Sequence, residues 1–278
     1  MSSRRFVFVG LALVGFAVTP IAARAQGAPT QAELDQISAR GRALAGYQRA
    51  AWNATVQLMA TNPDPSQVER YVAYHADSGW VVAFGKLDSQ RDTFYVSTIA
   101  VPAAVNGQRV DSVFEFHKFD APGPDIDFLV RATRAMDTAV VAMGAKGRAY
   151  QVAAIPAENG DWYVYLTPAS DFTSSFPLGD DVRYRISSEA DRILEVRRMH
   201  KGMVAFDRAT HSDAARLTAG RHKTSLRDEP EDSDIYHVLT RRPQVPEMVE
   251  TRHFRYEIGV DGSIKLLQGR EMQVGASR

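Results

Sequence analysis

The side chains best suited to chemistry gather between Gly220 and His237. This stretch contains His222, Asp234 and several further carboxylates, and the chain contains no cysteine. Imidazole and carboxylate are the ligands that zinc uses where thiolate is missing, and a catalytic zinc site needs three protein ligands and an open position for water. His211 precedes His222 by eleven positions and can join from a neighbouring strand. The stretch therefore predicts a zinc site made of His211, His222 and Asp234.

The spacing of these residues resembles part of the JAMM-type metalloprotease pattern, in which His-x-His is followed by Ser-x-x-Asp at the start of a helix. His222 and Asp234 match its outer positions, whereas Thr224 replaces the second histidine and Glu231 replaces the serine. The resemblance covers about 15 residues and implies a metal-dependent hydrolase. In that hydrolase Glu195, on a predicted strand, is the available general base for activating the bound water.

The same acidic residues also have a purely structural interpretation. Asp232, Ser233 or Asp234 can cap a helix that Ile235 begins, because their side-chain oxygens accept hydrogen bonds from free backbone N–H groups. The sequence alone leaves helix capping and metal binding open as alternatives.

A second candidate site is an arginine-rich hairpin. Guanidinium groups on one face of a sheet can bind a carboxylate or a phosphate in bidentate fashion. Acidic residues lie close to them in the sequence, so ordinary ion pairs across neighbouring strands are the alternative. The residues of this predicted anion site are Arg183, Arg185, Arg197 and Arg198.

The rest of the chain lacks the common catalytic signatures. It has no Gly-x-Ser-x-Gly elbow, no Ser-x-x-Lys, no His-Glu-x-x-His, no P-loop, no Gly-x-Gly-x-x-Gly and no EF-hand loop, which removes the usual hydrolase and nucleotide-binding interpretations. The lack of cysteine excludes a thiol nucleophile, disulfides and cysteine-based zinc sites.

Residues 1–25 are expected to form an export signal. Arg4 and Arg5 open it, an apolar stretch runs from Phe6 to Ala22, and the tripeptide ending at Ala25 matches a cleavage site. The apolar stretch of about 17 residues is short for a membrane span. Cleavage after Ala25 leaves a mature chain, 26–278, expected in a bacterial periplasm or outside the cell, with no integral membrane segment.

The charge of the chain argues against polyanionic partners. The full chain carries 33 basic and 33 acidic residues, and loss of the export signal with its three arginines leaves 30 basic against 33 acidic residues. Such a chain has no overall electrostatic attraction to nucleic acid or anionic lipid. An unknown protein or small molecule of the cell envelope is the expected partner.

Hydrophobic spacing predicts an α+β protein with an N-terminal helix and hairpin-rich antiparallel sheets, on which a second helix packs. Helices are expected at 31–60, 66–75 and 125–145, the second of them short. Strands are expected at 80–87, 93–101, 113–119, 162–166, 181–186, 193–200, 254–258 and 264–267. Residues 144–160 form a candidate sub-domain boundary.

Two functions follow from these observations. The preferred one is an exported, soluble envelope protein that acts by binding, without catalysis and without a cofactor, because no catalytic motif is intact. The alternative is a zinc-dependent hydrolase that uses the degenerate JAMM-like site. The two differ in geometry, because zinc ligands must converge to about 2.0–2.2 Å from one point.

Overall fold

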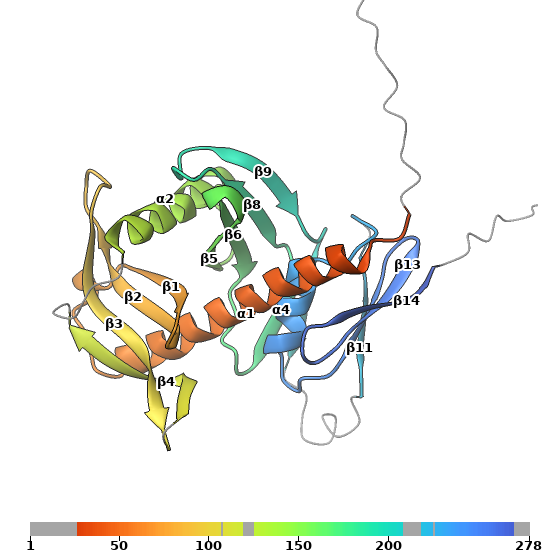
Figure 1. Ribbon diagram of the computed structural model, residues 1–278, viewed down its shortest axis with the longest axis horizontal. Helices are drawn as coiled ribbons and strands as arrows, with labels where there is room; N and C mark the ends of the chain where they lie inside the picture. The colour runs from red at the N-terminus through yellow and green to blue at the C-terminus, as the bar shows by residue number, and fades with distance from the viewer. Residues whose placement is uncertain (1–26, 107, 119–124, 208–217, 225, 270–278) are drawn as a thin grey trace, which may run out of the picture.

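The computed structural model describes residues 27–106, 108–118, 125–207, 218–224 and 226–269. The predicted export signal, residues 1–25, lies outside the described residues. The described part confirms the α+β class, with an N-terminal helix and mostly antiparallel sheets (Figure 1). Its α-helices are α1 (Gln31–Met59), α2 (Ile126–Met143) and α4 (Asp232–Thr240).

Helix α1 begins where the sequence predicts, because Thr30 and Glu33 form a capping box. The Thr30 amide donates to Glu33 Oε2 at 2.7 Å, and Thr30 Oγ1 accepts from the Glu33 amide at 3.3 Å. Two internal glycines leave the helix unbroken and serve packing instead. A Cβ at Gly41 would collide with Ile235 of α4, and a Cβ at Gly46 would collide with the indole of Trp80.

The first sheet follows α1 and has the order β1-β2-β3-β4, all antiparallel. The prediction of a helix over 66–75 is wrong, since only Pro65–Gln67 forms a 3-10 turn before an edge strand begins. The physical reason is that a tight turn at Asp77–Ser78 folds this segment back onto the strand that starts at Gly79, where backbone pairing outweighs weak helical spacing. The strands are β1 (Arg70–Ala76), β2 (Gly79–Leu87), β3 (Phe94–Val105) and β4 (Gln108–Lys118).

Three further sheets form the second half of the described chain. One has the antiparallel order β5-β6-β8-β9, one is the pair β7-β10, and one has the order β11-β12-β13-β14 with β11 and β12 parallel. Strands β5 to β9 are Tyr150–Pro156, Trp162–Pro168, Ser175–Gly179, Val182–Ile186 and Ile193–Arg198. Strands β10 to β14 are Met203–Asp207, Gly220–Lys223, Glu247–Glu250, Phe254–Ile258 and Ile264–Gly269.

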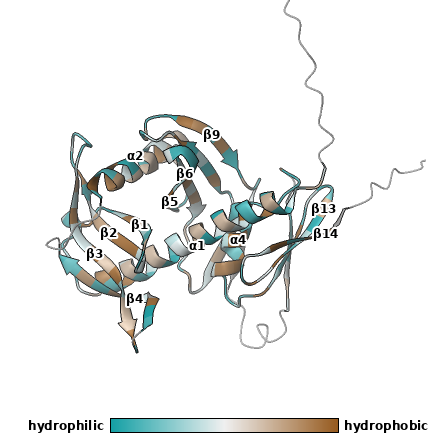
Figure 2. Ribbon diagram, in the orientation of Figure 1, coloured by the Kyte–Doolittle hydropathy of each residue, from teal (hydrophilic) through white to brown (hydrophobic). Residues whose placement is uncertain are grey.

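Two buried clusters hold these layers together, and α1 contributes to both, since it crosses the molecule from the first sheet towards β13 and β14 (Figure 1). The larger cluster joins α1 and α2 to the first two four-stranded sheets, where Figure 2 shows apolar residues along β2 and α2. It includes Leu129 and Val164, which lie on either side of the candidate sub-domain boundary at 144–160. The boundary itself stays a prediction. The smaller cluster consists of Leu34, Ile37, Ile235, Val238, Val249, Tyr256, Ile258 and Ile264.

No helix in the described ranges is long and apolar enough to cross a membrane.

Candidate metal centre

Three side chains from separate segments point their ligand atoms at one another. His200 follows the end of β9, His222 lies on β11 and Asp234 lies in the first turn of α4. Asp234 Oδ1 is 3.0 Å from His200 Nε2 and 2.9 Å from His222 Nε2, and all three atoms lie within 4.8 Å of one another. The side chains are 8%, 10% and 0% exposed, respectively. We call this set the His-His-Asp cluster.

The start of α4 orients the carboxylate of the cluster. Asp234 Oδ2 accepts a hydrogen bond of 2.8 Å from the amide of Glu231, the residue before the helix begins. Its other oxygen, Oδ1, is then left facing the two imidazoles. The two interpretations that the sequence left open are therefore compatible, because one oxygen of Asp234 serves the helix N-terminus while the other remains available to a metal.

Each histidine is held from behind by a second, buried carboxylate. His200 Nδ1 lies 2.9 Å from Asp181 Oδ1, and His222 Nδ1 lies 2.9 Å from Glu247 Oε1. A carboxylate that accepts from Nδ1–H fixes the tautomer in which Nε2 carries the lone pair, and this is the usual outer shell of a metal-bound histidine. The chain makes room for one of these partners at Gly220, where a Cβ would collide with the Glu247 carboxylate.

Both imidazoles of the cluster face the same carboxylate oxygen. His222 Nε2 is buried and lies 2.9 Å from Asp234 Oδ1. His200 Nε2 hydrogen-bonds to that same oxygen, at 3.0 Å. A cation between the three atoms would engage both nitrogens and the oxygen at once.

The electrostatics of the cluster favour positive charge. Burial by itself lowers the pKa of each histidine, but the neighbouring carboxylates, Asp234 first, outweigh it and raise the pKa of His200 to about 11 and of His222 to about 9. Burial raises the pKa of Asp234, yet the two histidines hold it well below its ordinary range. A divalent cation with two neutral imidazoles carries the same charge as two imidazolium ions, so a metal can replace two protons without changing the net charge.

A third histidine stands one helical turn after Asp234. Burial, followed by Arg241 and His222, lowers the pKa of His237 to about 3, so this imidazole is neutral near pH 7. Residues three positions apart on a helix lie on the same face. His237 thus adds a neutral ring beside the cluster.

Two of the three members of the cluster follow from the sequence. The structure brings His222 and Asp234 together as expected, and His211 lies outside the described residues. His200 was missed as a ligand, because the sequence places it at the end of an arginine-rich strand. Its proximity to α4 depends on how the second sheet packs against that helix, which no local pattern reveals.

Glu195, the expected general base, lies on the exposed edge strand β9. Its carboxylate is 3.7 Å from the guanidinium of Arg183, and its side chain is 44% exposed. It is not part of the His-His-Asp cluster, and its role as a base stays a prediction.

The four arginines of the predicted anion site do not share one open surface. Arg183 is buried and donates to Asp232 at 2.6 Å, and Arg185 donates to Asp161 at 2.9 Å. Arg197 donates to Glu231 at 2.7 Å and to Glu229 at 3.1 Å. Arg198 is exposed and lines a cavity of about 230 Å³ with Lys146 and Lys201. Acidic partners thus bind three of the four, and the anion-site role stays a prediction.

A pair of substitutions separates a structural arginine from a surface one. Arg183→Met should lower the free energy of unfolding by about 3 kcal/mol, because it leaves the buried Asp232 carboxylate with fewer cationic partners. Arg198→Met should change it by no more than about 0.5 kcal/mol, since Arg198 is exposed. Urea denaturation measures both values. Equal effects of the two substitutions would contradict this division of roles.

The likeness to JAMM-type metalloproteases stays confined to His222 and Asp234. Position 224, where that pattern has its second histidine, is a buried threonine whose amide donates to the Glu250 carbonyl at 2.9 Å. The additional imidazole of the cluster comes instead from His200, outside the pattern. No protein-family model matches the chain, and neither a curated protein nor a solved structure matches it.

Proposed function

We propose that this protein is a zinc-dependent hydrolase that holds one zinc ion with His200 Nε2, His222 Nε2 and Asp234 Oδ1. The observation that supports this proposal most strongly is the convergence of these three atoms from three separate segments. The carboxylates behind both histidines add to it, because they orient each Nε2 towards the same point.

The donor set and its spacing suit zinc. Imidazole nitrogen and carboxylate oxygen bind zinc at about 2.0–2.2 Å, so tetrahedral ligands stand about 3.3 Å apart. The two nitrogens lie 2.9 and 3.0 Å from Asp234 Oδ1, a few tenths of an ångström below this spacing, and all three atoms lie within 4.8 Å of one another. No cysteine is present to favour a softer metal.

The three ligands that the described residues supply are the number typical of a catalytic zinc site. Structural zinc sites usually have four protein ligands, whereas catalytic ones have three and keep a position for water. A zinc ion held by these residues would lower the pKa of a bound water to about 7 and so would supply hydroxide at neutral pH. The chain's own contribution is to orient the three ligands and, through Asp181 and Glu247, to keep the imidazoles in place.

Metal analysis with matched histidine variants tests the binding step. Residues 26–278, purified without chelator, should retain close to one zinc ion per chain, and His200→Ala and His222→Ala should each lose it. His253→Ala is the control, because His253 also pairs with a carboxylate, Asp228, at 2.7 Å, but lies outside the cluster. A protein that takes up no zinc, or that retains it in the His200 variant, would overturn the proposal.

Replacing zinc with cobalt tests the open position without knowledge of the substrate. The visible spectrum of a cobalt-loaded protein changes when azide replaces a bound water. We expect such a change in the wild type. If cobalt binds stoichiometrically but azide leaves the spectrum unaltered, the metal is coordinatively closed, and the hydrolase proposal fails while metal binding stands.

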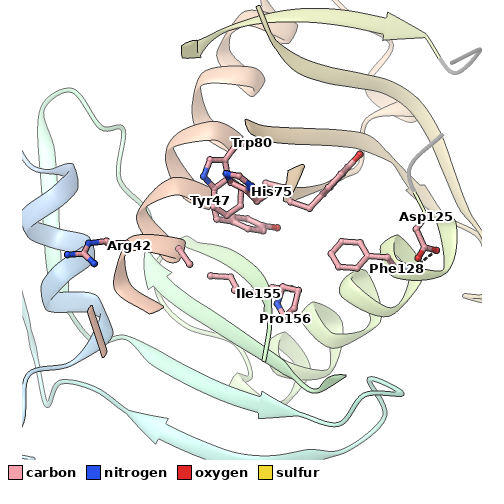
Figure 3. A pocket seen from close by; sticks show the side chains of 12 residues that line it. Arg42, Tyr47, His75, Trp80, Asp125, Phe128, Ile155 and Pro156 are labelled. Carbon is pink, nitrogen blue, oxygen red and sulfur yellow. Dashed lines mark hydrogen bonds between the residues drawn. The ribbon is translucent and has the colours of Figure 1, made fainter. Parts of the chain in front are cut away.

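Binding without catalysis, the function that the sequence preferred, is the second candidate. A cavity of about 660 Å³ (Figure 3) favours it, because none of the residues that line this cavity belongs to the His-His-Asp cluster. The expected location, a periplasm or the outside of the cell, is part of both proposals and rests on residues 1–25 alone.

A further inference from the structure

The cavity of about 230 Å³ is lined by one face of β8 and β9 and by the end of α2. The strand register places four of its side chains on that same face, Val182, Tyr184, Val196 and Arg198. Met143, the last residue of α2, also lines it. Sites for drug-sized molecules commonly measure about 300–1,000 Å³, so this cavity suits a smaller guest.

Three cations of the lining form no ion pair with a described residue. They are Lys146, Arg198 and Lys201, and all three are exposed. Arg198 differs in this from the other three arginines of β8 and β9, which acidic partners bind. The lining therefore carries positive charge that the described part of the chain leaves available to a ligand.

The two acids of the lining already have partners. Asp180 accepts from the Tyr150 hydroxyl at 2.7 Å, and Arg148 Nε lies 3.6 Å from the same carboxylate. Asp181 lies 2.9 Å from His200 Nδ1. The carbonyl end of α2 adds about half a negative charge to the lining. Three cations outweigh this partial charge, so the cavity favours an anion.

A tyrosine hydroxyl stands near one of these cations. Tyr184 lines the cavity with only 4% of its surface exposed, and its hydroxyl stays accessible and forms no hydrogen bond with a described residue. Burial raises the pKa of this hydroxyl, and the nearby Arg198 guanidinium opposes the rise. The hydroxyl and the guanidinium can therefore donate to the same anion.

The donors of the lining suit a phosphate group better than a carboxylate. A phosphate monoester carries about −1.5 to −2 charges at pH 7 and has three acceptor oxygens. Arginine binds it in bidentate fashion, and lysine binds it as a point charge. A carboxylate, with one charge and two oxygens, would match fewer of these donors. Met143, Val182 and Val196 give the cavity an apolar side as well, which suits a compact carbon body attached to the phosphate.

We propose that this cavity binds a small organic phosphate monoester through Arg198, Lys146 and Lys201, with Tyr184 donating to the phosphate. Of the four arginines of the predicted anion site, only Arg198 takes part. His200 lines the cavity and also belongs to the His-His-Asp cluster, so a bound ester would lie beside the proposed metal centre. Binding itself needs no zinc, and the proposal does not rest on the hydrolase function.

Calorimetry at pH 7.5 with three phenyl compounds tests the ligand class. The protein is freed of metal by a chelator and then dialysed, so no compound can bind through zinc. Phenyl phosphate should bind at one site, at least about fivefold more tightly than phenyl sulfate, which has the same shape but only one negative charge. Benzyl alcohol, which is neutral, should bind at least about 100-fold more weakly than phenyl phosphate. Absence of phenyl phosphate binding, or equal affinities for the phosphate and the sulfate, would overturn the proposal and leave zinc binding untouched.

Charge-removing variants test the location. Arg198→Met should weaken phenyl phosphate binding at least about tenfold, because a bidentate charged donor is lost, and Lys201→Met at least about fivefold. Arg192→Met is the control, since Arg192 is 74% exposed just before β9 and does not line the cavity. Circular dichroism verifies that all three variants fold. If Arg192→Met weakens binding as much as Arg198→Met does, the phosphate binds by overall charge and the assigned site is wrong.

Discussion

Asp234→Asn should weaken zinc binding by more than about 100-fold. Outer-shell partners of metal sites already contribute 10- to 100-fold in affinity, and Asp234 is the proposed anionic ligand, with one oxygen near both imidazoles of the cluster. Asparagine keeps the size of the side chain but removes the charge that faces both imidazoles at 2.9–3.0 Å. Zinc titration against a competing chelator measures the affinity. A loss of less than about tenfold would contradict the assigned role of Asp234.

Asp232→Asn is the matched control, two positions earlier in the same helix. The Asp232 carboxylate accepts from Arg183 at 2.6 Å and from the Tyr165 hydroxyl at 2.8 Å, so it stabilises the fold and not the metal. We expect this variant to lose about 3 kcal/mol of unfolding free energy, because buried cations are left without their partner. Its zinc affinity should stay within about tenfold of the wild type. If both variants lose zinc affinity in proportion to their loss of unfolding free energy, Asp234 affects zinc binding only by stabilising the fold.

Zinc binding should release about two protons at pH 6, where a zinc-bound water of pKa about 7 keeps its own protons. In the metal-free protein the pKa of His200 is about 11 and that of His222 is about 9, so both imidazoles are protonated at this pH. A metal binds only the neutral imidazole, and it therefore displaces both protons. Calorimetry in buffers of different ionisation enthalpy counts them. Between pH 5.5 and 6.5 the apparent zinc affinity should rise by about 100-fold per pH unit. Release of no protons would contradict the ligand assignment.

The stability of the metal-free protein should have the opposite pH dependence. Both histidines have a higher pKa in the folded protein than the ordinary value of about 6.5. Their contribution to stability is therefore complete below pH 6.5 and is lost as pH rises through about 9 and then about 11. The gap in melting temperature between zinc-loaded and metal-free protein should widen with pH. A gap that narrows would contradict the account.

Much of the fold follows from local patterns in the sequence. The Thr30 capping box starts α1 where expected, and Asp261-Gly262 joins β13 to β14 as the predicted hairpin turn. The segment after Pro65 was misassigned as helix because β1 is an edge strand whose residues do not alternate cleanly in burial. Its pairing with β2 decides its structure, and pairing is not a local property.

The candidate site could be predicted only in part, for the same reason. His222 and Asp234 lie within one short segment of the sequence, on β11 and on the helix α4 that follows it. His200 reaches them only because the sheet that ends in β9 packs beside α4. Glu247 reaches His222 through the parallel pairing of β11 with β12. Long-range packing of this kind leaves no spacing that a single sequence displays.

Anomalous X-ray scattering at the zinc edge, from crystals of residues 26–278 grown with zinc, tests the central claim most directly. We expect one strong peak at about 2.0–2.2 Å from His200 Nε2, His222 Nε2 and Asp234 Oδ1. A zinc peak on other ligands, or none between these three side chains in crystals that contain zinc, would contradict it.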